Sequence, residues 1–187
     1  MMEMLLSLWL PILVSAVVVW IASAMAWMVL PHHGNDWKGL PDEAGFFEAL
    51  RALKIGPGQY GFPHMADRKQ RNDPEFAKRC EAGPKGVLNV WPEKISMGRN
   101  MVLSFLFYLV VGVFVAYLGS IALPRGASFA KVFQLVGTAG IMAYTFASIP
   151  TAIWFNKPAP NVLSDLGDGV AYGLLTGAVF GVLWPGA

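Results

Sequence analysis

Histidine and aspartate residues near the start of this chain are the first that could do chemistry. His32 and His33 are adjacent, Asp36 follows three residues later, and His64 lies further along. Imidazole and carboxylate together suit zinc or iron. Adjacent histidines usually point in different directions, however, and neither an H-E-x-x-H nor an H-x-x-E-H pattern is present. We expect histidines that end a membrane helix and no cofactor, with a metal site that uses His32, His33, His64 and Asp36 as an alternative.

Two acids near the other end of the chain, Asp165 and Asp168, lie in an otherwise uncharged hydrophobic stretch. From Gly169 to Leu183 is about 15 residues or 22 Å of helix, less than the roughly 30 Å of a bilayer core. If this helix spans, Asp168 lies about one turn inside the apolar layer. An acid at that depth suggests a functional site with a partner. Because both acids would lie in the first turns of the helix, where its dipole favours negative charge, a structural role is the stronger interpretation.

The four expected membrane segments bring these polar residues to one membrane face. Loops that follow the first and the third segment lie on the same side of a membrane. We therefore expect one candidate polar cluster, composed of His32, His33, Arg99, Asp165 and Asp168.

Glycines recur every fourth residue in the same C-terminal stretch: Gly169, Gly173, Gly177 and Gly181. On a helix this spacing aligns them along one ridge, which lets another helix backbone approach closely in lipid. Two other segments repeat the spacing with small residues, at Gly112 and Ala116 and at Ala139 and Ala143. The pattern predicts close helix packing, within the chain or against other chains.

Composition places the chain among membrane proteins. Of its 187 residues 55% are hydrophobic, the mean hydropathy is +0.49, and 14% are charged against about 25% in soluble domains. A net charge of +2 does not favour nucleic acid as a partner. The single cysteine, Cys80, excludes an internal disulfide. No G-x-S-x-G, P-loop, C-x-x-C or c-type haem motif occurs, so we do not expect an enzyme.

Four hydrophobic segments predict four transmembrane helices, at residues 4–30, 101–123, 132–155 and 162–185. The first has no charge and is too long for a signal peptide, and Glu3 precedes it where a signal peptide has Lys or Arg. We expect it to be an uncleaved anchor. Pro150 is expected to bend the end of the third helix.

Residues 31–100 have a different composition. They hold 11 of the 14 Lys and Arg and 9 of the 12 Asp and Glu. Helical spacing of apolar residues predicts a helix at 42–53, Asn72-Asp73-Pro74 predicts the start of a second one, and 59–62 and 87–91 read as strands that could pair. The predicted fold is a mainly α membrane protein with four transmembrane helices and a small α+β extramembrane insertion between helices 1 and 2.

Several short motifs resemble those of one bacterial family of membrane proteins of unknown function. They are Pro31-His32-His33, Asp36-Trp37, Leu40-Pro41-Asp42-Glu43 and the run from Pro57 to His64. The resemblance implies four membrane segments and one inserted module, and it implies no activity.

The function that we expect is that of a non-catalytic accessory or structural subunit of a larger respiratory, photosynthetic or transport complex. Its expected partners are the lipid bilayer and other membrane subunits or further copies of the chain. The alternatives are an oligomeric ion- or proton-coupled transporter that uses Asp168, or a membrane metal-binding protein that uses His32 and His33. The side of the membrane that holds residues 31–100 carries four basic residues near the helix ends, and the opposite side carries two; they are Lys38, Lys94, Arg99 and Lys157 against Arg125 and Lys131. This excess predicts a cytoplasmic module in a bacterial inner membrane.

Overall fold

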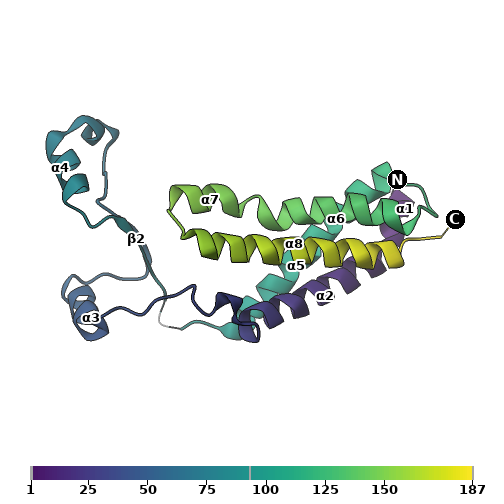
Figure 1. Ribbon diagram of the computed structural model, residues 1–187, viewed down its shortest axis with the longest axis horizontal. Helices are drawn as coiled ribbons and strands as arrows, with labels where there is room; N and C mark the ends of the chain where they lie inside the picture. Colours follow the sequence, from purple (N-terminus) through teal and green to yellow (C-terminus); the bar gives the residue numbers. More distant parts are fainter. Residues whose placement is uncertain (1, 93, 187) are drawn as a thin grey trace. The chain divides into compact units, whose positions relative to one another are not determined.

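The structure is a computed structural model that describes residues 2–92 and 94–186. It is mainly helical and forms two compact units (Figure 1). Unit 1 is Met1–Trp37 with Met97–Ala187, and unit 2 is Lys38–Ser96. Unit 1 contains α1 (Met2–Ser7), α2 (Trp9–Met28), η1 (Pro31–His33), α5 (Met97–Ala122), α6 (Phe129–Thr145), α7 (Ser148–Trp154) and α8 (Ala159–Val182).

Three stretches in the part of the chain that the structure describes are long and apolar enough to cross a membrane. They are Trp9–Met28, Met97–Ala122 and Phe129–Trp154, with mean hydropathies of 2.1, 2.5 and 1.5. This supports a membrane protein. The helix α8 has 24 residues but is not one of the three, because its glycines and two aspartates lower its hydropathy.

Prolines interrupt two of the helical stretches. Pro11 has no N–H to donate to the carbonyl of Ser7, and α1 ends at Ser7. Pro150 likewise cannot bond the carbonyl of Phe146, which accepts from the Ile149 N–H at 3.3 Å instead, and α6 and α7 are separate helices around this point. The predicted bend near Pro150 therefore takes the form of a break between two helices.

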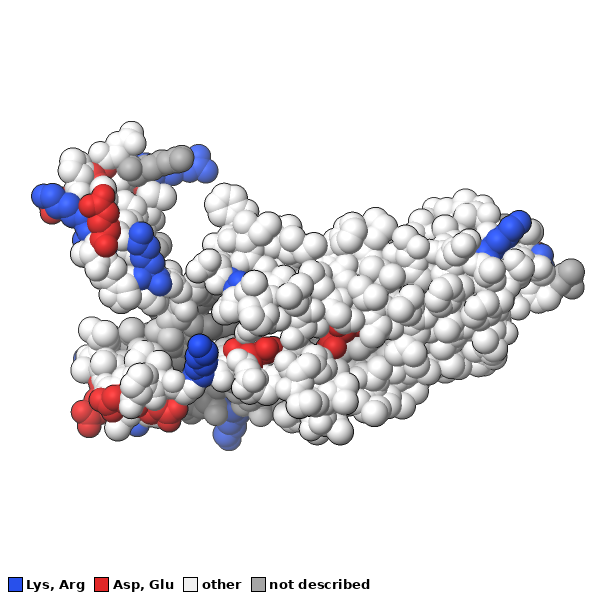
Figure 2. Space-filling view, viewed as in Figure 1, with Lys and Arg blue, Asp and Glu red and all other residues white. Residues whose placement is uncertain are grey.

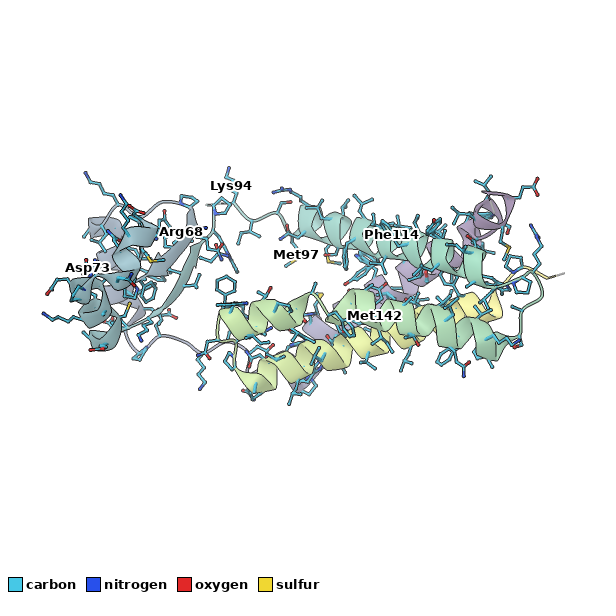
Figure 3. The ribbon with its side chains drawn as sticks, turned by 90° about the horizontal axis from the view of Figure 1, so that it is seen from above. Arg68, Asp73, Lys94, Met97, Phe114 and Met142 are labelled. Atoms are coloured by element: carbon cyan, nitrogen blue, oxygen red, sulfur yellow. The ribbon has the colours of Figure 1, made fainter. Side chains whose placement is uncertain are left out.

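The core of unit 1 lies where four helical stretches meet. Its fully or nearly buried residues are Leu8, Val111, Val115, Ala116, Val132, Val136 and Phe180. Apolar side chains cover the outside of the bundle as well. Phe114 on α5 is 66% exposed and Met142 on α6 is 48% exposed (Figure 3). On the face that Figure 2 shows, the helical unit is mostly free of charged side chains apart from a few small red and blue patches, as suits a lipid-facing surface.

Unit 2 folds as a small α+β module. It contains α3 (Glu43–Ala52), η2 (Arg68–Asn72), α4 (Pro74–Ala82) and two antiparallel strands, β1 (Gly58–Phe62) and β2 (Gly86–Val90), with Tyr60 opposite Leu88. The Asp42 carboxylate accepts from the Gly45 N–H, and the Asp73 carboxylate accepts from the Glu75 N–H, so both helices start with an aspartate cap. The unit is shorter than the predicted insertion of 31–100, because residues 31–37 and 97–100 belong to unit 1.

Candidate functional site

A tight turn after α2 presents both adjacent histidines to the same place. The carbonyl of Pro31 accepts from the Gly34 N–H at 2.9 Å, which closes the 3₁₀ turn η1. The ring centroids of His32 and His33 are 4.3 Å apart, and both rings reach Asp168 of α8. The expectation that the two histidines point apart is therefore wrong, because the turn is too tight to separate them.

Asp168 is the centre of the resulting cluster. Its Oδ1 lies 2.9 Å from His32 Nε2, and its Oδ2 lies 3.0 Å from His33 Nε2 and accepts from the Tyr172 hydroxyl at 3.1 Å. An ionised carboxylate only accepts hydrogen bonds, so both histidine nitrogens donate to it. The side chain of Asp168 is 15% exposed, which makes these bonds stronger than surface bonds.

His33 is held between two carboxylates. Its Nδ1 lies 2.6 Å from Asp36 Oδ2, and its Nε2 faces Asp168. Burial lowers the pKa of His33, but the hydrogen bonds and charges of Asp168 and Asp36 outweigh it and raise the pKa above the usual value. The Trp27 ring stacks on the His33 ring with centroids 3.9 Å apart and planes 6° apart. An imidazolium in this position gains cation–π attraction as well.

The first turns of α8 attach the histidine turn to the bundle. Asn161 Nδ2 donates to the Asp36 carbonyl at 2.9 Å, and the Ser164 hydroxyl donates to the His32 carbonyl at 3.4 Å. Lys157 forms an ion pair with Asp165. The N-terminal half of α8 thus fixes the backbone at His32 and Asp36 and the side chains of both histidines.

The structure brings together most of the polar residues that the sequence singled out. His32 and His33 contact Asp168 directly, Asp36 contacts His33, and Asp165 lies beside them with its lysine. Arg99 lies in the first turn of α5. His64 lies in unit 2, a unit separate from the one that holds the other two histidines.

Three contributors were not expected from the sequence: Trp27, Asn161 and Tyr172. Tyr172 carries a usable signal, because it follows Asp168 by four residues and so lies on the same face of a helix. The other two, Trp27 and Asn161, act from helix ends whose approach depends on the tertiary fold.

An aromatic cavity of about 150 Å³ adjoins the cluster. Asp165 and Asp168 line it together with Trp27, Phe107, Tyr108, Tyr144, Gly169 and Tyr172. The three tyrosine rings contact one another edge to face, at centroid distances of 6.0 to 6.3 Å. The walls are thus largely aromatic, and the carboxylates are its charged groups.

The glycine ridge of α8 packs inside the chain. A Cβ on Gly173 would lie 2.4 Å from the Ile141 backbone nitrogen, and one on Gly177 would lie 2.8 Å from Gly137 Cα. Gly169 similarly meets the backbone of Tyr144, and Gly181 meets the ring of Phe129. The helices α6 and α8 therefore run antiparallel in close contact, and the ridge is occupied by α6.

The other small residues have different environments. Gly112 faces Ile12 of α2, where a Cβ would be 3.2 Å from a methyl group, and Ala116 is fully buried in the core. Ala139 is half-buried, whereas Ala143 is exposed. Since α6 meets α8 through Gly137 and Gly140, the predicted alanine stripe is not the surface by which α6 packs on α8.

The fold and the site together define a helical membrane-type bundle with a His–Asp cluster at the end of α2. No protein-family model, curated protein or solved structure matches this chain. Function must therefore be argued from the geometry of unit 1.

Proposed function

We propose that this chain is a four-span integral membrane protein with a non-catalytic role, an accessory or structural subunit of a larger membrane complex. The observation that carries the proposal is the packing of α8 along α6. Contacts run from Gly169 beside Tyr144 to Gly181 beside Phe129, so α8 is matched in length to a helix that belongs to a candidate span.

Contacts at the C-terminal end of α8 support the fourth crossing. The Pro185 carbonyl accepts from the Gly126 N–H at 2.8 Å, and Trp184 Nε1 donates to the Pro124 carbonyl at 2.9 Å. Pro124 and Gly126 lie in the link between α5 and α6. The end of α8 thus returns to the side of the membrane that this link occupies.

Exposed apolar surfaces on other helices support a role in assembly. The glycine ridge is filled by α6, so contact with other subunits would use the outer faces of α2 and α5. Those faces carry large side chains that are about half or more exposed, among them Ile21, Met25, Leu106, Val110 and Phe114. Such faces suit both lipid and neighbouring helices.

Ion or proton transport through Asp168 is less well supported by the geometry. Three side chains hold this carboxylate in hydrogen bonds, which favours a fixed structural tie over a carrier that must exchange protons. The excess of Lys and Arg beside unit 2 supports a cytoplasmic module in a bacterial inner membrane.

The test is purification of the tagged full chain in a mild detergent, followed by native gel electrophoresis and mass spectrometry of what accompanies it. We expect a particle well above the mass of one 20.3 kDa chain with its detergent, with the same partner subunits in repeated preparations. A single-chain particle in several mild detergents and in lipid nanodiscs would contradict the subunit role.

A further inference from the structure

We propose that His32, His33 and Asp168 bind one divalent transition-metal ion at the end of unit 1 where η1 meets the N-terminal half of α8. The three residues offer His32 Nε2, His33 Nε2 and a carboxylate oxygen, all within 4.8 Å of one another. The set of two imidazoles and one carboxylate suits Zn²⁺ and Fe²⁺.

The distances fit a bound ion after a small adjustment. The two Nε2 atoms lie 2.9 and 3.0 Å from the Asp168 oxygens. Ligands of a tetrahedral zinc at 2.0–2.2 Å are about 3.3 Å apart. Each histidine–Asp168 pair therefore has to open by a few tenths of an ångström, and the two histidine nitrogens, which lie within 4.8 Å of one another, have to reach the same separation. Rotation of the carboxylate and of the part-exposed His32 ring can supply both changes.

The partner of the second His33 nitrogen is what singles this cluster out. Nδ1 lies 2.6 Å from Asp36 Oδ2, so an Nδ1–H can keep donating to Asp36 when an ion takes the place of the Nε2 proton that Asp168 otherwise accepts. Histidines that bind metals almost always donate their other N–H to a carboxylate, a backbone carbonyl or a water, and Asp36 supplies the carboxylate here. Asp36 is thus a positioning residue, and Asn161 fixes it by donating to its carbonyl.

The charges of the cluster also favour a divalent cation. Asp165 is paired with Lys157, whereas the carboxylates of Asp36 and Asp168 both face His33, so the cluster holds two negative charges for an ion that takes the place of the Nε2 protons. A divalent cation balances these charges in a place where the His33 side chain is only 4% exposed. Tyr172 donates to Asp168 and orients it as a ligand.

The experiment uses the full chain in detergent, purified with a tag that contains no histidine and stripped with a chelator. Zn²⁺ is titrated by calorimetry, stoichiometry is measured by elemental analysis, and Co²⁺ serves as the spectroscopic probe. We expect one ion per chain and visible Co²⁺ bands of a four- or five-coordinate nitrogen and oxygen site. His64→Gln is the matched control, because it removes a histidine of unit 2 and should leave affinity and spectrum unchanged.

Variants of the cluster decide the outcome. His33→Gln and Asp168→Asn should abolish stoichiometric binding, and Asp36→Asn should weaken it by about 10- to 100-fold. If those variants do not fold, His32→Gln is used instead, because the His32 side chain is 33% exposed and its loss should be tolerated by the fold. The folded His32→Gln chain should lack the Co²⁺ bands of the wild type. Absence of stoichiometric binding of Zn²⁺, Co²⁺, Fe²⁺ and Mn²⁺ by the wild-type chain, or equal binding by His32→Gln and the His64→Gln control, would overturn the proposal.

Discussion

Replacing Gly173 by alanine should weaken the bundle, and the size of the effect can be worked out from the structure. The new Cβ would lie 2.4 Å from the Ile141 nitrogen and 2.8 Å from its Cα, whereas ordinary contact begins at 3.4 Å. The difference, 3.4 − 2.4 Å, means that α6 and α8 must separate locally by about 1 Å. Backbone atoms cannot turn aside as a side chain can, so we expect a loss of about 1–3 kcal/mol, typical of overpacking.

Gly167 provides the matched control on the same helix. A Cβ there meets nothing within 4 Å, so Gly167→Ala should leave stability unchanged or raise it by up to about 1 kcal/mol through helix propensity. Unfolding of both variants in detergent, followed by tryptophan fluorescence against heat and against sodium dodecyl sulfate, measures the difference. Equal stability of Gly173→Ala and Gly167→Ala would contradict the close contact between α6 and α8 at Gly173.

Four further substitutions test other contacts. Asp168→Asn should lower the stability of the bundle by about 1–3 kcal/mol, since an amide cannot accept from both histidines and Tyr172 as a carboxylate does. The control Asp165→Asn breaks a part-exposed ion pair and should lower the stability by about 1 kcal/mol or less in the same melts. Trp184→Phe should cost about 0.5–1.5 kcal/mol by removing the bond to the Pro124 carbonyl, and unchanged melting would contradict that bond. Asp73→Ala should speed hydrogen exchange in α4 by removing its cap and leave exchange in unit 1 unchanged. Faster exchange in both units would contradict the division of the chain into two independently folded units.

Local signals in the sequence predicted much of the fold. The aspartates at 42 and 73 mark helix starts because capping depends on residues within one turn, and both cap in the structure. The four-residue spacing of the α8 glycines likewise follows from helix geometry, and it predicts a ridge without saying which helix fills it. Ala143 shows that limit, since it has the spacing of a packing residue but is exposed.

The candidate site depended more on tertiary structure. Topology alone predicted that the histidines and the C-terminal acids share one end of the helices. The convergence of His32 and His33 on one carboxylate required the 3₁₀ turn after Pro31, and the stacking of Trp27 on His33 required the end of α2 to lie beside that turn. Neither follows from residue spacing, because both depend on how α2 and α8 pack.

Whether α8 crosses the membrane is the central question, and labelling of single cysteines answers it without a prior assumption about orientation. The native Cys80 reports unit 2, Gly186→Cys in a Cys80→Ser chain reports the end of α8, and Arg125→Cys in the same background reports the α5–α6 link. A membrane-impermeant maleimide is applied to intact and to lysed spheroplasts. Four spans predict that positions 186 and 125 label from the same side and Cys80 from the other. Labelling of positions 186 and 80 from the same side, opposite to position 125, would show that α8 does not cross and would contradict the account.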